Sequence, residues 1–170
     1  MSKKAIFFDR DGVLNEDDGY VHSIEKLRWI AGAREAVGRL TKEGWLLFVV
    51  TNQSGVARGY YFEDDVKTLH REMNREFARF GGTIKEFFYC PHLPGATVPQ
   101  YDKVCSCRKP APGMILAALS KYHLDKKECF LLGDGERDIE AAERAGIQGF
   151  LFSGGNLDLF IQKMLPEKRN

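Results

Sequence analysis

Five short apolar runs, separated by longer segments with helical periodicity, constrain the fold of this chain more than any other feature. The runs are too short for helices, and they are too continuously apolar for strands with one face in water. Each therefore predicts a strand that is buried on both faces, as in a parallel sheet covered by helices. They span residues 4–8, 45–50, 83–89, 129–133 and 147–152.

The intervening segments show apolar residues at helical spacing and end at glycines or polar residues. We expect helices over residues 33–44, 63–80, 112–123 and 137–146, then a last short helix and a frayed tail at 166–170. Strands alternating with helices predict an α/β fold with a doubly wound parallel sheet. The length of 170 residues suits one core, so we expect a single domain over residues 1–170.

Charge and hydropathy exclude several classes of partner. The net charge is +1, which gives no electrostatic basis for binding nucleic acid or an acidic membrane surface. The first apolar run is too short for a signal peptide or a membrane span, so we expect a cytoplasmic protein. Nothing in the sequence suggests an obligate interface, which favours a monomer.

Polar clusters follow several of the apolar runs. Asp9 and Asp11 follow the first run, the segment 51–55 (TNQSG) follows the second, and Asp134 follows the run at 129–133. Lys109 lies in the loop before the predicted helix at 112–123. Each cluster alone could be a turn or a helix cap. Ligands of such sheets bind beyond the carboxyl ends of the strands, so the shared placement favours a functional site.

These residue types suit phosphoryl transfer. Two carboxylates as close as Asp9 and Asp11 repel each other unless positive charge lies near them. Asp9 could attack phosphorus, and Asp11 could protonate the leaving oxygen and then activate water. Mg²⁺, with Asp134 completing its ligands, would offset the charge of the phosphate. The Thr51 hydroxyl and the Lys109 ammonium could hold the phosphoryl oxygens.

Several longer motifs resemble the haloacid-dehalogenase-type (HAD) phosphatases, and most closely their D-glycero-D-manno-heptose 1,7-bisphosphate 7-phosphatase family. The likeness extends from about Ala5 to Phe152. The motifs are FFDRDGVLN (7–15), DGYVH (18–22), TNQSGVARG (51–59), YCPHLP (89–94), VCSCRKPAPGM (104–114) and the later GD (133–134).

The resemblance implies a HAD-like Rossmannoid fold without a cap domain. It implies removal of the sugar 7-phosphate through an aspartyl-phosphate, in nucleotide-activated heptose and lipopolysaccharide biosynthesis. Asp9 would be the nucleophile and Asp11 the general acid and base. Mg²⁺ would bind Asp9, Asp134 and the backbone carbonyl of Asp11, while Thr51 and Lys109 stabilise the phosphoryl group.

The same resemblance implies a set of substrate contacts. It also exposes one departure, since relatives usually carry a lysine after GD where this chain has Gly135. Arg137 is the nearest residue that could replace that charge. The expected contact residues are Asp17, Asp18, Gly19, Tyr20, Thr51, Asn52, Gln53, Ser54, Arg108 and Lys109.

Three cysteines and a histidine form a candidate Zn²⁺ site in a loop at 90–107. Cys90 and His92 are followed by twelve residues and then by Cys105 and Cys107. A Cys₃His set suits a closed tetrahedral zinc site, and a loop this long needs a cross-link to hold its conformation. A disulfide is the alternative, but it leaves His92 unexplained and suits cytosol poorly. We interpret the zinc as structural, holding Arg108 and Lys109 at the phosphate.

Two other functions remain open from the sequence. The first is a phosphatase acting on another small phosphate ester, with histidinol phosphate as the leading candidate because histidinol phosphatases resemble this chain too. The second is a receiver-like signalling module that accepts a phosphoryl group and keeps it. Asp11 favours a hydrolase, because a long-lived phospho-acceptor has no use for a general acid and base beside its nucleophile.

Overall fold

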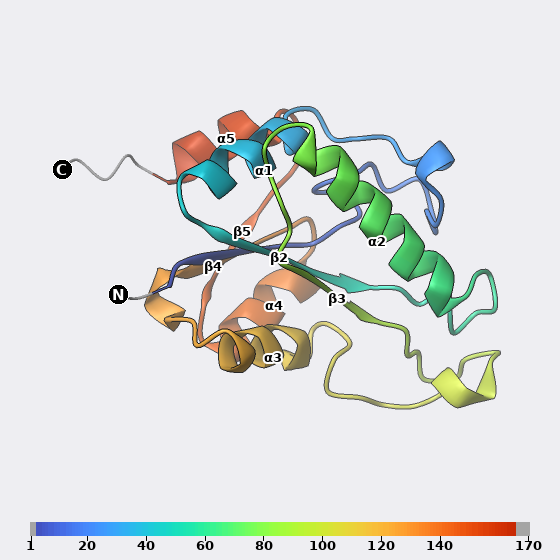
Figure 1. The fold of residues 1–170 in the computed structure, drawn as a ribbon. Coiled ribbons are helices and arrows are strands. Elements are labelled where there is room, and N and C mark those ends of the chain that lie inside the picture. The colour runs from blue at the N-terminus through green and yellow to red at the C-terminus, as the bar shows by residue number, and fades with distance from the viewer. Residues whose placement is uncertain (1–2, 166–170) are drawn as a thin grey trace.

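A five-stranded parallel sheet forms the centre of the molecule (Figure 1). The computed structural model describes residues 3–165, and the strands lie in the order β3-β2-β1-β4-β5 with every neighbouring pair parallel. This arrangement confirms the predicted doubly wound α/β class. The strands are β1 (Ala5–Phe8), β2 (Leu46–Asn52), β3 (Glu86–Cys90), β4 (Cys129–Gly133) and β5 (Gln148–Leu151).

Helices cover both faces of the sheet (Figure 1). One layer contains α1 (Ala33–Lys42), α2 (Glu63–Ala78) and α5 (Leu157–Met164), and the other contains α3 (Gly113–Lys121) and α4 (Glu136–Ala145). Each expected helix is present, with ends that differ by at most two residues from the predicted ones. The expected frayed tail at 166–170 lies outside the described residues.

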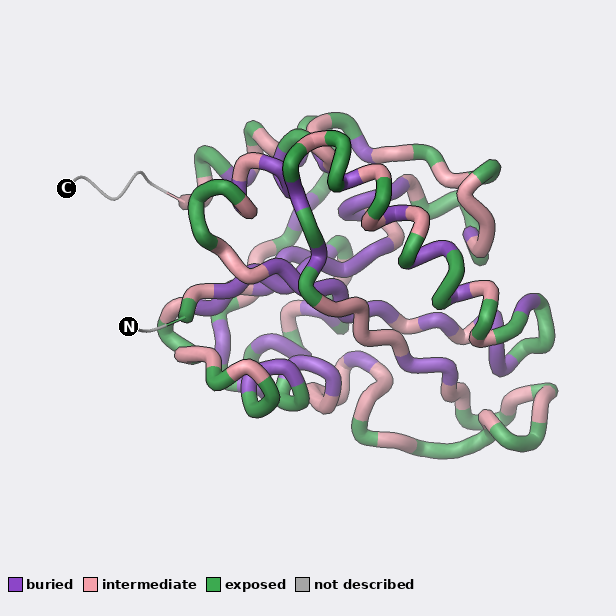
Figure 2. Tube along the Cα trace, in the orientation of Figure 1, coloured by how far each residue is buried: buried purple, intermediate pink, exposed green. Residues whose placement is uncertain are grey.

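Side chains alternate along the central strand and divide the core in two. Ile6 and Phe8 belong to the core on the α1 face, whereas Ala5 and Phe7 belong to the core on the α3 face. All four are completely buried, and Figure 2 shows the same burial running along the inner strands. A strand with both faces covered accounts for the continuous apolar runs in the sequence.

The third strand begins later than the sequence predicts. We expected it over 83–89, but β3 starts at Glu86. The reason is the side-chain amide of Asn74, whose Oδ1 accepts from Ile84 N–H at 2.8 Å and whose Nδ2 donates to Ile84 C=O at 2.9 Å. Because both backbone groups of Ile84 bond to α2, they cannot join the sheet ladder.

The two longest connections stay at the edge of the sheet and form no cap domain. Residues 9–32 contain one short 3₁₀ helix, Ile24–Lys26, and residues 91–112 contain another, Pro99–Tyr101. Over the described part of the chain, no helix combines the length and the hydrophobicity that crossing a bilayer requires.

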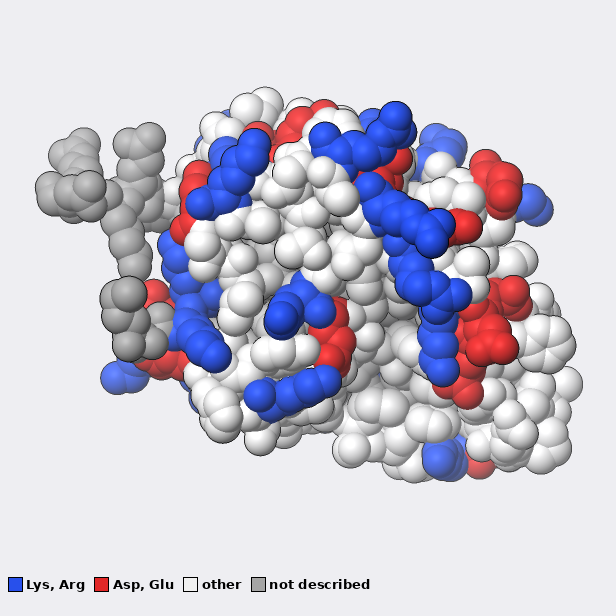
Figure 3. Space-filling view, viewed as in Figure 1, with Lys and Arg blue, Asp and Glu red and all other residues white. Residues whose placement is uncertain are grey.

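The outer surface of α2 carries a row of basic side chains (Figure 3). They are spaced by four residues, and Glu76 pairs with Arg79 at 3.3 Å and with Arg34 from α1 at 3.0 Å. A row of this kind, interspersed with acids, is typical of a solvated helix face. Its members are Lys67, Arg71, Arg75 and Arg79, all of which are exposed.

Gly38 lies where α1 crosses the end of α2, and it provides a test of this packing. A Cβ at Gly38 would lie 2.1 Å from the carbonyl oxygen of Phe80. Gly→Ala in a helix ordinarily stabilises, but we expect Gly38→Ala to lower the free energy of unfolding by about 1–3 kcal/mol, the usual cost of overpacking. Urea denaturation of Gly38→Ala beside the exposed control Glu35→Ala measures this, and a stabilised Gly38→Ala would contradict the packing.

Candidate active site

Lys109 lies between two buried carboxylates at the carboxyl edge of the sheet. Its Nζ is 3.0 Å from Asp9 Oδ1 and 2.6 Å from Asp138 Oδ1, and it donates to Val50 C=O at 2.8 Å. All three charged residues are at most 3% exposed. Asp9 follows β1 and Asp138 lies in the first turn of α4, so a loop lysine joins two elements that are far apart in sequence.

A third acid, Asp134, lies beside this pair of carboxylates. Carboxylate oxygens of Asp9, Asp134 and Asp138 lie within 4.8 Å of one another. Burial raises the pKa of Asp9 to about 8, although the adjacent Lys109 ammonium acts against the rise. A cluster of hard oxygen donors with excess negative charge fits a divalent cation such as Mg²⁺. Asp138 was not among the ligands expected from the sequence, which were Asp9, Asp134 and the carbonyl of Asp11.

Two glycines let these acids approach the chain closely. A Cβ at Gly12 would lie 2.0 Å from Asp134 Oδ2, and one at Gly133 would lie 2.2 Å from Asp138 Cβ. Gly12 also has a φ of +90°, a conformation that side chains of L-residues rarely adopt. Glycine at these positions is therefore part of how the sequence builds the acidic cluster.

The side-chain amide of Asn52 holds the backbone of Lys109. Asn52 Oδ1 accepts from Lys109 N–H at 3.0 Å, and Nδ2 donates to Lys109 C=O at 3.2 Å. We expected Asn52 to contact substrate. Although it lines the cleft described below, its amide already bonds to Lys109, which gives the residue a structural task at the site.

Asp11 takes its hydrogen bonds from a separate set of groups. Its Oδ1 accepts from Arg10 Nη2 at 3.1 Å and from Asn15 Nδ2 at 3.0 Å, and its Oδ2 accepts from Gln53 Nε2 at 3.2 Å. Arg10 is completely buried and lies 3.1 Å from His70 Nε2 of α2. Burial and the Arg10 charge lower the pKa of His70 well below its usual range. The repulsion expected between Asp9 and Asp11 is thus countered by Lys109 on one and Arg10 on the other.

A cleft of about 370 Å³ opens over these residues. Thr51 and Lys109 are buried directly behind it, where they contact the lining residues Gln53 and Asp9. Asp18 is not in the lining, and its carboxylate pairs with Arg28 Nε at 2.8 Å. The lining contains Asp9, Asp11, Asp17, Gly19, Tyr20, Asn52, Gln53, Ser54 and Arg108 from the predicted set, with Arg58, Tyr61 and Arg137 in addition.

A second hollow, of about 670 Å³, is lined in part by Asp134 and Gly12. Its lining includes Glu16 and Asp134 but no lysine or arginine, whereas the first cleft has three arginines. An anionic ester is therefore better matched by the smaller cleft.

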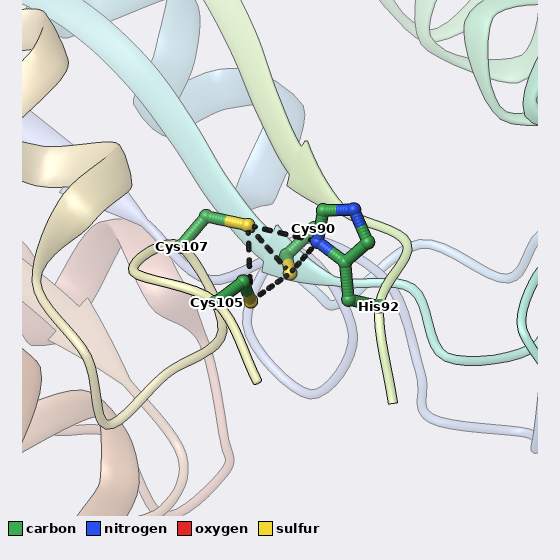
Figure 4. Close-up of side chains that lie close together, drawn as sticks. All are labelled: Cys90, His92, Cys105 and Cys107. Carbon is green, nitrogen blue, oxygen red and sulfur yellow. Dashed lines mark hydrogen bonds between the residues drawn. The ribbon is translucent and has the colours of Figure 1, made fainter. Parts of the chain in front are cut away.

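The four predicted zinc ligands lie together (Figure 4). Cys105 Sγ is 3.5 Å from the sulfurs of both Cys90 and Cys107, which are 2.7 Å apart. His92 Nδ1 lies 3.6 Å from Cys90 Sγ and 3.4 Å from Cys107 Sγ. Tetrahedral Zn²⁺ with Zn–S bonds of ~2.3 Å separates its sulfurs by about 3.8 Å. The soft donor set and most of these distances fit zinc, and the cysteines are free thiols rather than disulfides.

This cysteine–histidine cluster anchors the two basic residues that follow it. The backbone N–H of Arg108 donates to Cys105 Sγ at 3.3 Å, and Arg108 Nη1 donates to the carbonyl of His92 at 3.3 Å. Glu63 secures the outer part of the loop by accepting from the hydroxyls of Tyr89 and Tyr101, each at 2.7 Å. Metal at this cluster would therefore act on the position of Arg108 and Lys109 through one or two peptide units.

Sequence reasoning missed four residues of the site. Asp138 looked like a first-turn acid favoured by the helix dipole, and Arg10 looked like part of a turn. Arg58 lay inside a quoted motif without an assigned role. Tyr61 carried no signal, since a tyrosine before a helix is most often a packing residue.

Comparison with known proteins points to one group of enzymes. A family model described as HAD-hydrolase-like matches residues 106–159. D-glycero-β-D-manno-heptose-1,7-bisphosphate 7-phosphatase of Rhodopseudomonas palustris is 44% identical over 97% of this chain and 92% of its own length. The Escherichia coli K12 protein of that name is 42% identical over 86% of this chain and 76% of its own.

Solved structures agree with the sequence relatives. The D,D-heptose 1,7-bisphosphate phosphatase of B. bronchiseptica, complexed with magnesium and phosphate, superposes with a TM-score of 0.81 at 38% identity, covering 96% of this chain and 89% of that one. A putative HAD-like phosphatase of Mesorhizobium loti gives 0.83 at 29% identity, covering 91% and 74%.

Proposed function

Because the chain belongs to the D-glycero-β-D-manno-heptose-1,7-bisphosphate 7-phosphatase family of HAD-like hydrolases, we propose that it removes the 7-phosphate of that sugar bisphosphate. The observation that carries the proposal is the distribution of charge in the cleft. Asp9, Asp11 and the buried Lys109 lie at its base, where a phosphoryl group would react, and arginines line it farther out.

The arginines suit a substrate with a second phosphate. Arg58, Arg108 and Arg137 line the cleft, and within residues 3–165 none of them forms an ion pair. Guanidinium groups without an acidic partner bind phosphate oxygens well. Arg137 also lies where it could supply the charge that relatives take from a lysine at the position of Gly135.

In the first chemical step, an oxygen of Asp9 attacks phosphorus and the bond to the sugar oxygen breaks. The electron pair stays on the sugar oxygen, which takes a proton from Asp11. Lys109 stabilises the charge on the phosphoryl oxygens together with Thr51. Substrate contacts come from the cleft residues, Ser54, Asp17, Gly19, Tyr20 and Arg108 among them.

In the second step, Asp11 takes a proton from water while the water oxygen attacks the phosphorus of the aspartyl-phosphate. The bond between phosphorus and Asp9 breaks, which releases inorganic phosphate, restores the Asp9 carboxylate and leaves Asp11 protonated for the next turnover. Asp9, Asp134 and Asp138 would hold Mg²⁺, with the carbonyl of Asp11 as a further candidate ligand. When bound, the ion would neutralise phosphoryl charge beside the acids. A phosphoryl-storing receiver module would not need Asp11 beside the nucleophile.

We assign a structural Zn²⁺ to Cys90, His92, Cys105 and Cys107. The support is the proximity of the four donors and their link to Arg108. Thiolate ligands survive best where thiols stay reduced, which agrees with a cytoplasmic location. We propose that the enzyme acts there as a monomer on a small-molecule substrate.

A panel of phosphate esters tests the function. Phosphate release under Mg²⁺ is measured for both anomers of heptose 1,7-bisphosphate, fructose 1,6-bisphosphate and histidinol phosphate. We expect one heptose anomer to have a kcat/KM at least about tenfold above that of the other esters. A substrate that leaves polar groups of the cleft without hydrogen-bond partners is bound less well in the transition state. The product should retain its 1-phosphate. Equal rates across the panel would leave only a generic phosphatase, and a preference for histidinol phosphate would favour the alternative.

Substituting Asp9 and substituting Asp11 should have different effects on turnover. Asp9→Asn should abolish turnover, because an amide does not attack phosphorus. Asp11→Asn should bind Mg²⁺ normally, since a carbonyl is its proposed ligand, but lower kcat by roughly 10²–10⁴, the usual contribution of general acid–base catalysis. The matched control is Asp125→Asn. Asp125 lies before the first residue of β4, at the end of the strand that is opposite to the proposed site. Near-normal kcat in Asp9→Asn would rule out the covalent mechanism.

Zinc removal should act through Arg108 and Lys109. Purified protein should contain about one equivalent of Zn²⁺, the capacity of one Cys₃His set. Cys107→Ala should lose that metal and much of the activity, although the thiol touches no substrate. Cys129→Ala is the matched control, because Cys129 is a buried core thiol in β4. The zinc content and the kcat of each variant are measured side by side. Full activity in protein without zinc would contradict the proposal that zinc holds Arg108 and Lys109 in place.

A further inference from the structure

The hydroxyl of Tyr61 reaches Asp11 through a single intermediate side chain. Tyr61 OH donates to Gln53 Oε1 at 2.6 Å, and Gln53 Nε2 donates to Asp11 Oδ2 at 3.2 Å and to Thr51 Oγ1 at 2.9 Å. Tyr61, Gln53 and Thr51 are each at most 5% exposed. The proposed general acid and base is thus bound by a group whose own orientation depends on a buried tyrosine.

The chemistry of these groups leaves one consistent orientation of the amide. In the step that takes a proton from water, the Asp11 carboxylate only accepts hydrogen bonds, which fits the Gln53 NH₂ that donates to it at 3.2 Å. The amide carbonyl then faces Tyr61, whose hydroxyl must donate. A flipped amide would place its carbonyl oxygen against the Asp11 carboxylate and its NH₂ against the hydroxyl, which would lose the bond to Asp11 and replace it by repulsion.

Tyr61 is itself held rigidly. Its ring stacks on His22 with the centroids 4.8 Å apart and the planes at 14°. On another side it lies against Gly55, where a Cβ would come within 2.2 Å of the ring. It also packs with Val56 and Val66. The hydroxyl is therefore placed by packing before any substrate arrives, which is the condition for a supporting group to fix a reacting one.

We propose that Tyr61 is a positioning residue for Asp11: it orients the Gln53 amide, which fixes Oδ2 of the carboxylate at the angle needed to protonate the leaving oxygen. This role rests on the proposed phosphatase mechanism. Arg10 and Asn15 hold Oδ1 at 3.1 and 3.0 Å, whereas Arg10 reaches Oδ2 only at 3.4 Å. Loss of the tyrosine hydroxyl would therefore leave Asp11 in the site with Oδ2 held less firmly than Oδ1.

The test is Tyr61→Phe, which keeps the ring and its stacking and removes one hydroxyl. Two substrates are compared under Mg²⁺: the heptose bisphosphate, whose alkoxide leaves only with a proton, and p-nitrophenyl phosphate, whose phenolate leaves without one. We expect kcat on the sugar to fall about fivefold to tenfold, as for one hydrogen bond, with KM within about twofold. The loss on the aryl ester should be under twofold.

Tyr122→Phe is the matched control. Its hydroxyl donates to Glu86 at 2.8 Å in a partly buried setting near α3, so the same chemical change occurs far from Asp11. This variant should keep both rates. In a Gln53→Ala background, Tyr61→Phe should produce no further change in the ratio of the two rates, because the intermediate is already missing.

Several results would overturn the role. Equal losses on the two esters would indicate a general structural effect, and a rise in KM with unchanged kcat would indicate substrate binding. An unchanged Tyr61→Phe would show that the hydroxyl does not act on Asp11. Wild-type protein that hydrolyses neither ester would overturn the proposed phosphatase function itself. An active wild type with an unaffected Tyr61→Phe variant would overturn only the role of Tyr61.

Discussion

The buried ammonium of Lys109 is the interaction on which the rest of the site depends. It pairs with the buried carboxylates of both Asp9 and Asp138, and an unpaired buried charge is far costlier than a paired one. Lysine is suited to this position because one compact charge can bond to Asp9, Asp138 and Val50 at once. The Asn52 amide holds its backbone and the cysteine–histidine cluster holds the residue before it. Segments that are distant in sequence therefore fix the position of Lys109 through its side chain, its backbone and the residue before it.

The same pairing leaves the site short of positive charge. Lys109 pairs with two of the three carboxylates in the cluster of Asp9, Asp134 and Asp138, and burial raises the pKa of Asp9 to about 8. The proposed attack by Asp9 requires the ionised carboxylate, which burial disfavours. A divalent cation among these oxygens would supply what is missing. In the proposed mechanism, metal bound at these oxygens would therefore favour the ionised form of Asp9.

The fold and the base of the site were accessible from the sequence because their signals are local. Apolar runs predict buried strands, and the parallel arrangement brings Asp9, Thr51 and Asp134 to one edge. What could not be read are pairings between distant residues. Asp138 lies 29 residues from Lys109, and nothing near it distinguishes a bridging acid from a helix-capping one. The expected strand at 83–85 was wrong for the same reason, since the Asn74 amide that occupies Ile84 lies on another element.

Asp9 and Asp11 are two residues apart but are expected to do opposite work, and the structure separates their surroundings accordingly. Asp9 is 3% exposed and faces the ammonium of Lys109, which follows the loop with the cysteine–histidine cluster. The Asp11 side chain is 23% exposed and faces a guanidinium and two amides on the other side of the chain. A nucleophile benefits from a fixed charge and a dry setting, whereas a group that exchanges protons with sugar oxygen and water needs access to both. Asp9 and Asp11 are separated by one residue after β1, and their carboxylates lie in different environments. The buried Arg10 between them helps to keep them apart by bonding to Asp11.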